Sequence, residues 1–183
     1  MSQPARFFVA LLPPQAVQEV ANQVKQYFSD RYASRAAQKS PPHITLQPPF
    51  QWPWEQLPSL EQRLAAFAQQ QLAVPVTLEG YGAFPPRVIY IHVHASPELL
   101  ALQSALQTHL APILGQIEPT GQSRPFVPHM TVAFRDLTTP NFRQAWAEFA
   151  GRSLYVEFVV THLTLLLHDG QRWMVHREFP LAS

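Results

Sequence analysis

The sequence predicts an α+β protein in which antiparallel strands predominate. Strand-like and helix-like stretches alternate in the order β-α-β-α-β-β-α-β-α-β-β, and two pairs of successive strands are joined by short turns, as in hairpins. Hydrophobic residues make up 46% of the 183 residues, enough to bury a sizeable core. We find no long polar linker, so we expect residues 1–183 to form one domain.

The first part of the chain contains two strands, each followed by a helix. Residues 6–12 are a short apolar run, typical of a strand, and residues 15–32 carry apolar side chains at helical spacing. Residues 43–46 alternate between polar and apolar side chains and are expected to form a strand. Residues 54–71, rich in Gln, Ala and Leu, are expected to form a helix that starts near Pro53 or Pro58.

The middle of the chain predicts a hairpin and then a helix. Residues 74–81 and 87–95 are rich in strand-forming residues, and a segment containing Gly and two Pro separates them. Ser96 followed by Pro97 is typical of a helix N-terminus, because serine caps free N–H groups and proline fits the first turn. We expect this helix to run to about residue 114.

The last third is expected to contain three more strands and one more helix. Residues 116–125 are expected to be a loop. The strands are predicted at 129–135, 154–167 and 173–179, the last two flanking a turn at Asp169-Gly170, and the helix at 141–150.

Composition excludes several classes of function. There is no cysteine, so thiol catalysis, disulfides and cysteine-ligated zinc are excluded. No apolar run approaches the roughly 20 residues that cross a bilayer, and we expect a cytoplasmic monomer without membrane partners. The net charge is +1, without a basic stripe, so a nucleic-acid partner would be a nucleotide or a short RNA end. Eight histidines in a chain with few charged residues direct attention to imidazole chemistry.

Two segments share the pattern Pro-His-apolar-Thr-apolar. They are residues 42–46 (PHITL) and 128–132 (PHMTV), separated by about half the chain. Residues i and i+2 of a strand share a face, so His43 and Thr45 should point one way, as should His129 and Thr131. The apolar residues between them should point into a core.

Two such strands facing one cleft would present two imidazoles and two hydroxyls. Opening a cyclic phosphodiester requires a base for the attacking water, an acid for the departing oxygen and donors for the other phosphoryl oxygens. Histidine, with a pKa of roughly 6.5, serves as either acid or base at neutral pH, and threonine hydroxyls donate hydrogen bonds. We therefore expect His43 and His129 to be catalytic and Thr45 and Thr131 to bind phosphate, without a metal or other cofactor.

A structural interpretation competes with the catalytic one, since threonine is a good strand former and a half-buried strand histidine is ordinary. For one copy we would prefer that interpretation, but two copies, each preceded by proline, favour catalysis. A third match, His162-Leu163-Thr164-Leu165, lacks the proline and lies in a long apolar stretch. We interpret His162, Thr164 and His168 as the more hydrated face of that strand.

These residues resemble the 2H phosphoesterase superfamily, specifically its 2′-5′ RNA ligase-like and RNA 2′,3′-cyclic phosphodiesterase members. That family is defined by two His-apolar-Thr-apolar motifs, and the resemblance covers nearly the whole chain. It implies a bilobal α+β fold of two pseudo-symmetric halves, with mainly antiparallel sheets flanking a central cleft and helices outside. It also implies hydrolysis of 2′,3′-cyclic phosphates of RNA ends or nucleotides, or 2′-5′ joining of RNA ends without ATP.

Several supporting residues have two interpretations. Many family members carry Arg five residues after the second histidine, whereas here Phe134 holds that position and Arg135 follows. Arg135 is either a phosphate ligand, on the same strand face as His129, or a solvated charge at a strand end. Phe8, Phe50 and Phe126 are candidates for stacking on a base, although a core position is the more common one for phenylalanine.

Two other functions stay open at this point. One is a non-catalytic module that binds nucleotides or RNA ends on the same scaffold. The other is a metal hydrolase using His92 and His94, which share a strand face but lack an obvious third ligand.

Overall fold

Two four-stranded antiparallel sheets form the framework of the structure. The computed structural model describes residues 4–115 and 125–183. The strand order is β2-β1-β7-β8 in the first sheet and β5-β4-β3-β6 in the second. The strands are β1 Ala5–Leu11, β2 Ile44–Trp52, β3 Val74–Phe84, β4 Val88–Val93, β5 His129–Ala133, β6 Tyr155–Val160, β7 His162–His168 and β8 Trp173–Pro180.

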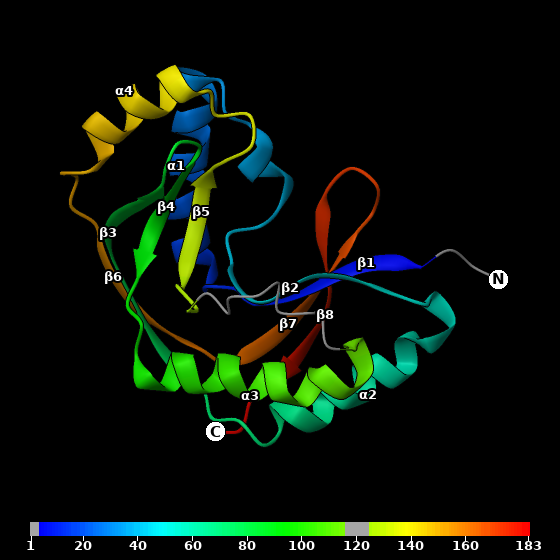
Figure 1. Cartoon of the computed structure of the whole chain (residues 1–183). Coiled ribbons are helices and arrows are strands. Elements are labelled where there is room, and N and C mark those ends of the chain that lie inside the picture. Colours follow the sequence, from blue (N-terminus) through cyan, green and yellow to red (C-terminus); the bar gives the residue numbers. More distant parts are fainter. Residues whose placement is uncertain (1–3, 116–124) are drawn as a thin grey trace.

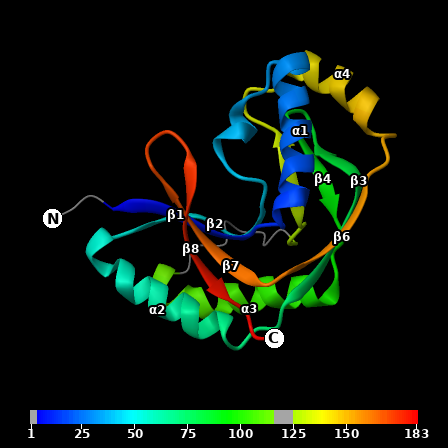
Figure 2. The ribbon, with the colours of Figure 1, turned by 180° about the vertical axis from the view of Figure 1, so that it is seen from behind.

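Helices cover the outer faces of both sheets (Figures 1 and 2). Helices α2 (Leu57–Ala68) and α3 (Pro97–Leu114) pack against the first sheet, and α3 also reaches β3. Helices α1 (Gln15–Tyr32) and α4 (Thr139–Phe149) pack against the second sheet. The chain thus leaves the first sheet after β1, forms α1 against β5 of the second sheet, and returns to the first sheet at β2. Two short 3₁₀ turns, η1 (Ala36–Lys39) and η2 (Trp54–Gln56), precede β2 and α2.

The apolar sides of the two sheets belong to one continuous core. Alternate residues of β1, namely Phe7, Val9 and Leu11, are fully buried beneath the helices, and the buried residues of both sheets form one cluster. The opposite side of the first sheet carries a smaller apolar cluster of Phe8, Ala10 and Leu166. The first sheet therefore has a helix-covered face and a second face that turns toward the other sheet.

The predicted fold class is confirmed. The helix expected at residues 15–32 has those bounds, and Ser96 caps α3 by accepting a hydrogen bond from the Leu99 N–H. The helix expected at 54–71 is shorter, because η2 occupies its first turn. Residues 116–124 of the expected loop lie outside the described residues.

The single strand expected at residues 154–167 is wrong, because it is two strands in different sheets. β6 pairs with β3 in the second sheet, and β7 pairs with β1 and β8 in the first. The chain changes sheets at Thr161. A continuous run of strand-forming residues gives no sign of this crossing, because both strands have the same local preferences.

Strand β2 extends past its expected end at residue 46 and runs through the Pro48-Pro49 pair. β2 is an edge strand, so the missing N–H groups of the prolines interrupt no inner ladder. The pairing of β1 with β2 shifts register on either side of Val9, which accommodates the irregularity. Strand β5 is shorter than expected and ends at Ala133, two residues before Arg135.

Candidate active site

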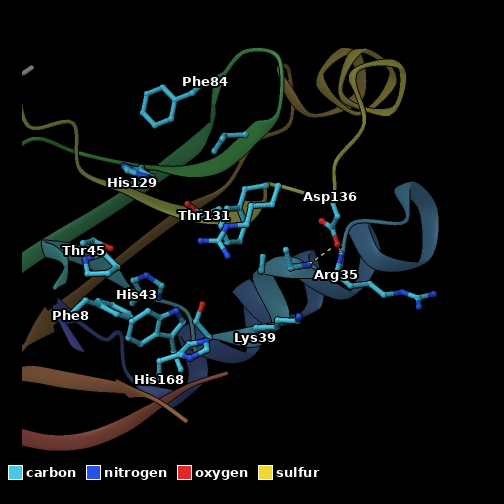
Figure 3. Close-up of a pocket in the computed structure, with 18 residues that line it drawn as sticks. Phe8, Arg35, Lys39, His43, Thr45, Phe84, His129, Thr131, Asp136 and His168 are labelled. Carbon is cyan, nitrogen blue, oxygen red and sulfur yellow. Dashed lines mark hydrogen bonds between the residues drawn. The ribbon is translucent and has the colours of Figure 1, made fainter. Parts of the chain in front are cut away.

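The two His-x-Thr pairs line the same cavity. It has a volume of about 720 Å³ and lies between the two sheets, with His43 and Thr45 on one side and His129 and Thr131 on the other (Figure 3). The four apolar residues that alternate with them are almost fully buried: Ile44, Leu46, Met130 and Val132. The predicted strand parity is thus confirmed, and two segments far apart in sequence share one cleft.

Both imidazoles are held in the same way by their own backbone. Nδ1 of His43 lies 2.7 Å from the carbonyl oxygen of Pro41, and Nδ1 of His129 lies 2.7 Å from that of Val127. A carbonyl only accepts, so Nδ1 must carry the proton and donate it. Nε2 is then the free nitrogen, with a lone pair when the ring is neutral and a proton when it is charged. In each histidine, Nε2 is therefore the ring nitrogen that is not engaged by the chain's own backbone.

Burial makes His43 hard to protonate. Its side chain is half-buried, and its ring packs on Phe8 with 4.8 Å between centroids. Loss of water lowers the pKa of His43 from 6.5 to about 4; the hydrogen bond to Pro41 opposes this, while the charges of Lys25 and His129 add to it. At neutral pH His43 is an unprotonated imidazole, which is the form that a base requires.

Cationic side chains outnumber anionic ones around the cavity. Arg35, Lys39 and Arg135 line it, and Asp136 is its one acidic lining residue among the described positions. Asp136 is already engaged, because its carboxylate accepts hydrogen bonds from the Ser34 hydroxyl and from the N–H groups of residues 35 and 36. The lining thus favours an anion.

Arg135 lines the cavity, but it is not on the strand that carries His129, as the alternation of strand residues had predicted. It lies beyond the end of β5 in the left-handed region, with φ = 59°, and its guanidinium lies 5.0 Å from the centre of the Phe134 ring. Non-glycine residues adopt such a φ seldom, and they cluster at functional sites. The cavity position fits a phosphate ligand, although the backbone turn after β5, and not a shared strand face with His129, brings Arg135 there.

Aromatic side chains lie at two ends of the cavity. Phe84 packs against His129 with 5.1 Å between centroids, and Trp173 packs against Phe8 at 4.6 Å. Figure 3 shows Phe84 beyond His129 and His168 beyond His43. The sequence gives no sign that Phe84 or Trp173 lines the cavity. Each lies in a hairpin, and the position of that hairpin depends on long-range packing.

The phenylalanines considered for base stacking have different positions. Phe8 lines the cavity but is 3% exposed, so its ring supports His43 and offers little free surface. Phe50 is buried in the main core, and Phe126 is partly buried against that core. Neither lines the cavity, so the core interpretation holds for both.

The third His-x-Thr segment is not part of the cavity. His162 is exposed and its Nδ1 lies 2.9 Å from the Thr161 hydroxyl. The expectation of a hydrated face is wrong for Thr164, which is 1% exposed because the smaller apolar cluster covers its face of β7. His168 is half-buried and lines the cavity beside Trp173.

His92 and His94 lie close together, as their spacing predicts. Their ring centroids are 6.1 Å apart, and Nε2 of His94 lies 3.3 Å from a carboxylate oxygen of Glu79, with both side chains exposed. No group of three His, Asp or Glu side chains within residues 4–115 and 125–183 is arranged to hold a metal ion. Glu79 therefore does not complete a three-ligand set with His92 and His94 in the described part of the chain.

Fold and cleft together define a two-histidine, two-lobed α+β protein of the 2H phosphoesterase class. The model of the 2′-5′ RNA ligase superfamily matches residues 13–172, and the chain belongs to this family.

Relatives and solved structures agree with this assignment. A protein of Geobacillus kaustophilus named "Putative phosphoesterase" is 27% identical over 178 residues, with 95% of each chain covered, and one of Bacillus cytotoxicus with the same description is 28% identical, with 96% of each covered. The fold is similar to that of TT0787 from Thermus thermophilus, with a TM-score of 0.68, 23% identity, and 96% of this chain and 97% of that chain covered. It is also similar to LigT of Escherichia coli in complex with 3′-AMP, with a TM-score of 0.69, 22% identity, and 99% and 100% covered.

Within the described residues, no helix is both long enough and apolar enough to cross a membrane.

Proposed function

We propose that this chain is a metal-independent phosphoesterase that hydrolyses 2′,3′-cyclic phosphates of nucleotides or RNA ends by acid–base catalysis with His43 and His129. One observation carries the proposal: two His-x-Thr pairs, with both imidazoles held through Nδ1 on a backbone carbonyl, line one cavity. This arrangement supplies a proton acceptor and a proton donor for one phosphorus atom.

In the proposed reaction, one histidine accepts a proton from water through Nε2 as the water oxygen bonds to phosphorus. The other histidine donates its Nε2 proton to the ribose oxygen as the bond between that oxygen and phosphorus breaks. The hydroxyls of Thr45 and Thr131 donate hydrogen bonds to the non-bridging oxygens, and Arg135 balances their charge. A 5′-hydroxyl in place of the water would form a 2′-5′ link by the same proton transfers.

The proposed ligand is a nucleotide or a short RNA end. Three cationic side chains line the cavity, and exposed aromatic surface from Phe84 lies beside His129. Stacking on aromatic rings is the usual way in which unpaired bases are held. The solved LigT structures with 3′-AMP, phosphate and ATP agree with a nucleotide-sized anion in a related fold.

The test is turnover of the four nucleoside 2′,3′-cyclic phosphates by chelator-treated protein, with chromatographic separation of the 2′- and 3′-phosphate products. Wild type should hydrolyse at least one of them, and His43→Ala and His129→Ala should each be slower by roughly 10²–10⁴. His162→Ala is the matched control, because it alters a third His-x-Thr segment that lies outside the cavity. Equal rates in wild type and both active-site variants would refute the proposal.

A binding module on the same scaffold is the competing function. It predicts saturable binding of cyclic or 2′-phosphorylated nucleotides with no product formed. Calorimetric titration beside the product assay separates the two functions.

A further inference from the structure

Asp136 is an anionic residue in a cavity whose lining otherwise favours anions. It is the one acidic lining residue among the described positions, and it directly follows Arg135, which also lines the cavity. Like charges repel, so on Coulomb energy alone a carboxylate at this position weakens the binding of a phosphate. Asp136 is favourable for binding only if another effect of its side chain outweighs that repulsion.

The backbone at Arg135 is strained. Its φ is 59°, and the N–H of Asp136 donates a hydrogen bond of 2.7 Å to the carbonyl oxygen of Phe134. A hydrogen bond between residues i and i+2 around a positive φ is characteristic of the classic γ-turn, which is rare and strained. Such a conformation persists in a non-glycine residue only where the surrounding structure fixes it.

The carboxylate of Asp136 makes the contacts that fix this turn. One oxygen accepts a hydrogen bond of 2.9 Å from the Ser34 hydroxyl, and the other accepts bonds of 2.8 and 3.0 Å from the N–H groups of Arg35 and Ala36. Hydrogen bonds to a carboxylate are stronger than those between neutral groups. Ser34 is 1% exposed, so the carboxylate is attached to a buried part of the chain.

These hydrogen bonds join the segments that flank the two motifs. Ala36 lies seven residues before His43, and Asp136 lies seven residues after His129. Figure 3 shows the bonds from Asp136 to the backbone before β2 as dashed lines. The contact therefore ties the turn that carries Arg135 to the segment that leads into the first motif.

We propose that Asp136 is a positioning residue whose carboxylate holds the strained turn and thereby keeps Arg135 placed to bind the phosphate. This rests on the proposed function, in which Arg135 balances the charge of the phosphoryl oxygens. Asp136 itself takes no part in proton transfer and does not bind the substrate. A guanidinium that is already in place loses less conformational freedom on binding, and this gain outweighs the repulsion from the carboxylate.

The direction of the effect of Asp136→Asn separates positioning from charge. The substitution removes the negative charge and one of the two acceptor oxygens, with little change in volume. If only charge mattered, a phosphate ligand would bind more tightly. The proposed role predicts the opposite, a loss of roughly 3–10-fold in affinity for adenosine 2′-monophosphate. Asp30→Asn is the matched control, because Asp30 is an exposed carboxylate of α1 outside the cavity lining and its affinity should equal that of wild type.

A double-mutant cycle with Arg135→Ala tests whether Asp136 acts through the guanidinium. Calorimetric titration gives the affinity of wild type, each single variant and the double variant for adenosine 2′-monophosphate. Arg135→Ala should bind about 10–100-fold more weakly than wild type, and adding Asp136→Asn should weaken binding no further. A merely structural Asp136 would weaken binding by the same factor with and without Arg135, and that result overturns the proposal. Unchanged or tighter binding by Asp136→Asn alone also overturns it.

Ser34→Ala decides the matter if Asp136→Asn does not fold. It removes one hydrogen bond to the carboxylate, leaves every charge in place, and alters a residue outside the cavity lining. We expect binding weaker by roughly 2–5-fold when Arg135 is present and unchanged when Arg135 is replaced by alanine. Full affinity in Ser34→Ala would contradict the proposed role.

The two proposals fail separately, because binding is measured without turnover. If wild type hydrolyses no cyclic phosphate but the cycle shows the expected coupling, only the proposed function fails. If wild type is active but the two substitutions act independently, only the role of Asp136 is wrong. A wild-type protein that does not bind adenosine 2′-monophosphate at all would also overturn the role of Asp136.

Discussion

The half-buried ring of His43 predicts a specific loss of stability in acid. Its pKa is about 4 in the folded protein and near 6.5 in an exposed chain. Between these values the unfolded state binds a proton that the folded state does not, so the free energy of unfolding falls as the pH is lowered from 6.5 to 4. The full difference corresponds to about 3 kcal/mol, and we expect about 2–3 kcal/mol because the ring keeps some contact with water.

Replacing His43 with glutamine removes this titration. Urea unfolding of wild type and His43→Gln at pH 4, 5, 6 and 7 measures it, and the variant should lose about 2–3 kcal/mol less than wild type across that range. His162→Gln controls for the loss of an imidazole outside the cavity. If His43→Gln and wild type lose stability in parallel, the ring is not desolvated and the account of its pKa is wrong.

Three further substitutions test the framework of the site. Asp136→Ala removes three hydrogen bonds, from Ser34, Arg35 and the first residue of η1, and it should lower the free energy of unfolding by about 2–4 kcal/mol in urea; an unchanged midpoint would contradict that role. Gly82→Ala would place a Cβ 2.4 Å from the Tyr90 ring that packs on His129, so it should cost about 1–3 kcal/mol and reduce turnover; adding Tyr90→Leu should restore part of the stability, and no recovery would refute the clash. Thr164→Val should stabilise the protein by about 1 kcal/mol in thermal unfolding, because the buried Thr164 hydroxyl has no hydrogen-bond partner among the described residues; a destabilised variant would show that the hydroxyl has one.

Local signals were sufficient for most of the helices and for the faces of the two motifs. Ser96 and Pro97 mark the start of α3, and the alternation around His43 correctly places Ile44 in the core. These features depend on neighbours within a few residues, where propensity and periodicity act. The prediction that the two motifs face one cleft rested on the presence of two copies of the pattern, because neither copy alone indicates a partner.

Features that depend on long-range packing could not be predicted. The change of sheet at Thr161 depends on which neighbouring strands are available to pair with β6 and β7. The sequence predicted a strand that runs to Arg135, but β5 ends at Ala133 and Arg135 adopts a left-handed backbone conformation beyond it. In the sequence, Lys25 is an ordinary polar position of an amphipathic helix. Only the crossing of α1 onto the second sheet buries it behind the first motif.

The most direct test of the central claim is a double-mutant cycle on kcat/KM with His43→Ala, His129→Ala and the double variant. If both imidazoles act on one phosphorus atom in one step, the double variant should be about as slow as the slower single variant. Losses that multiply in the double variant would show that the two rings contribute independently and would contradict the account.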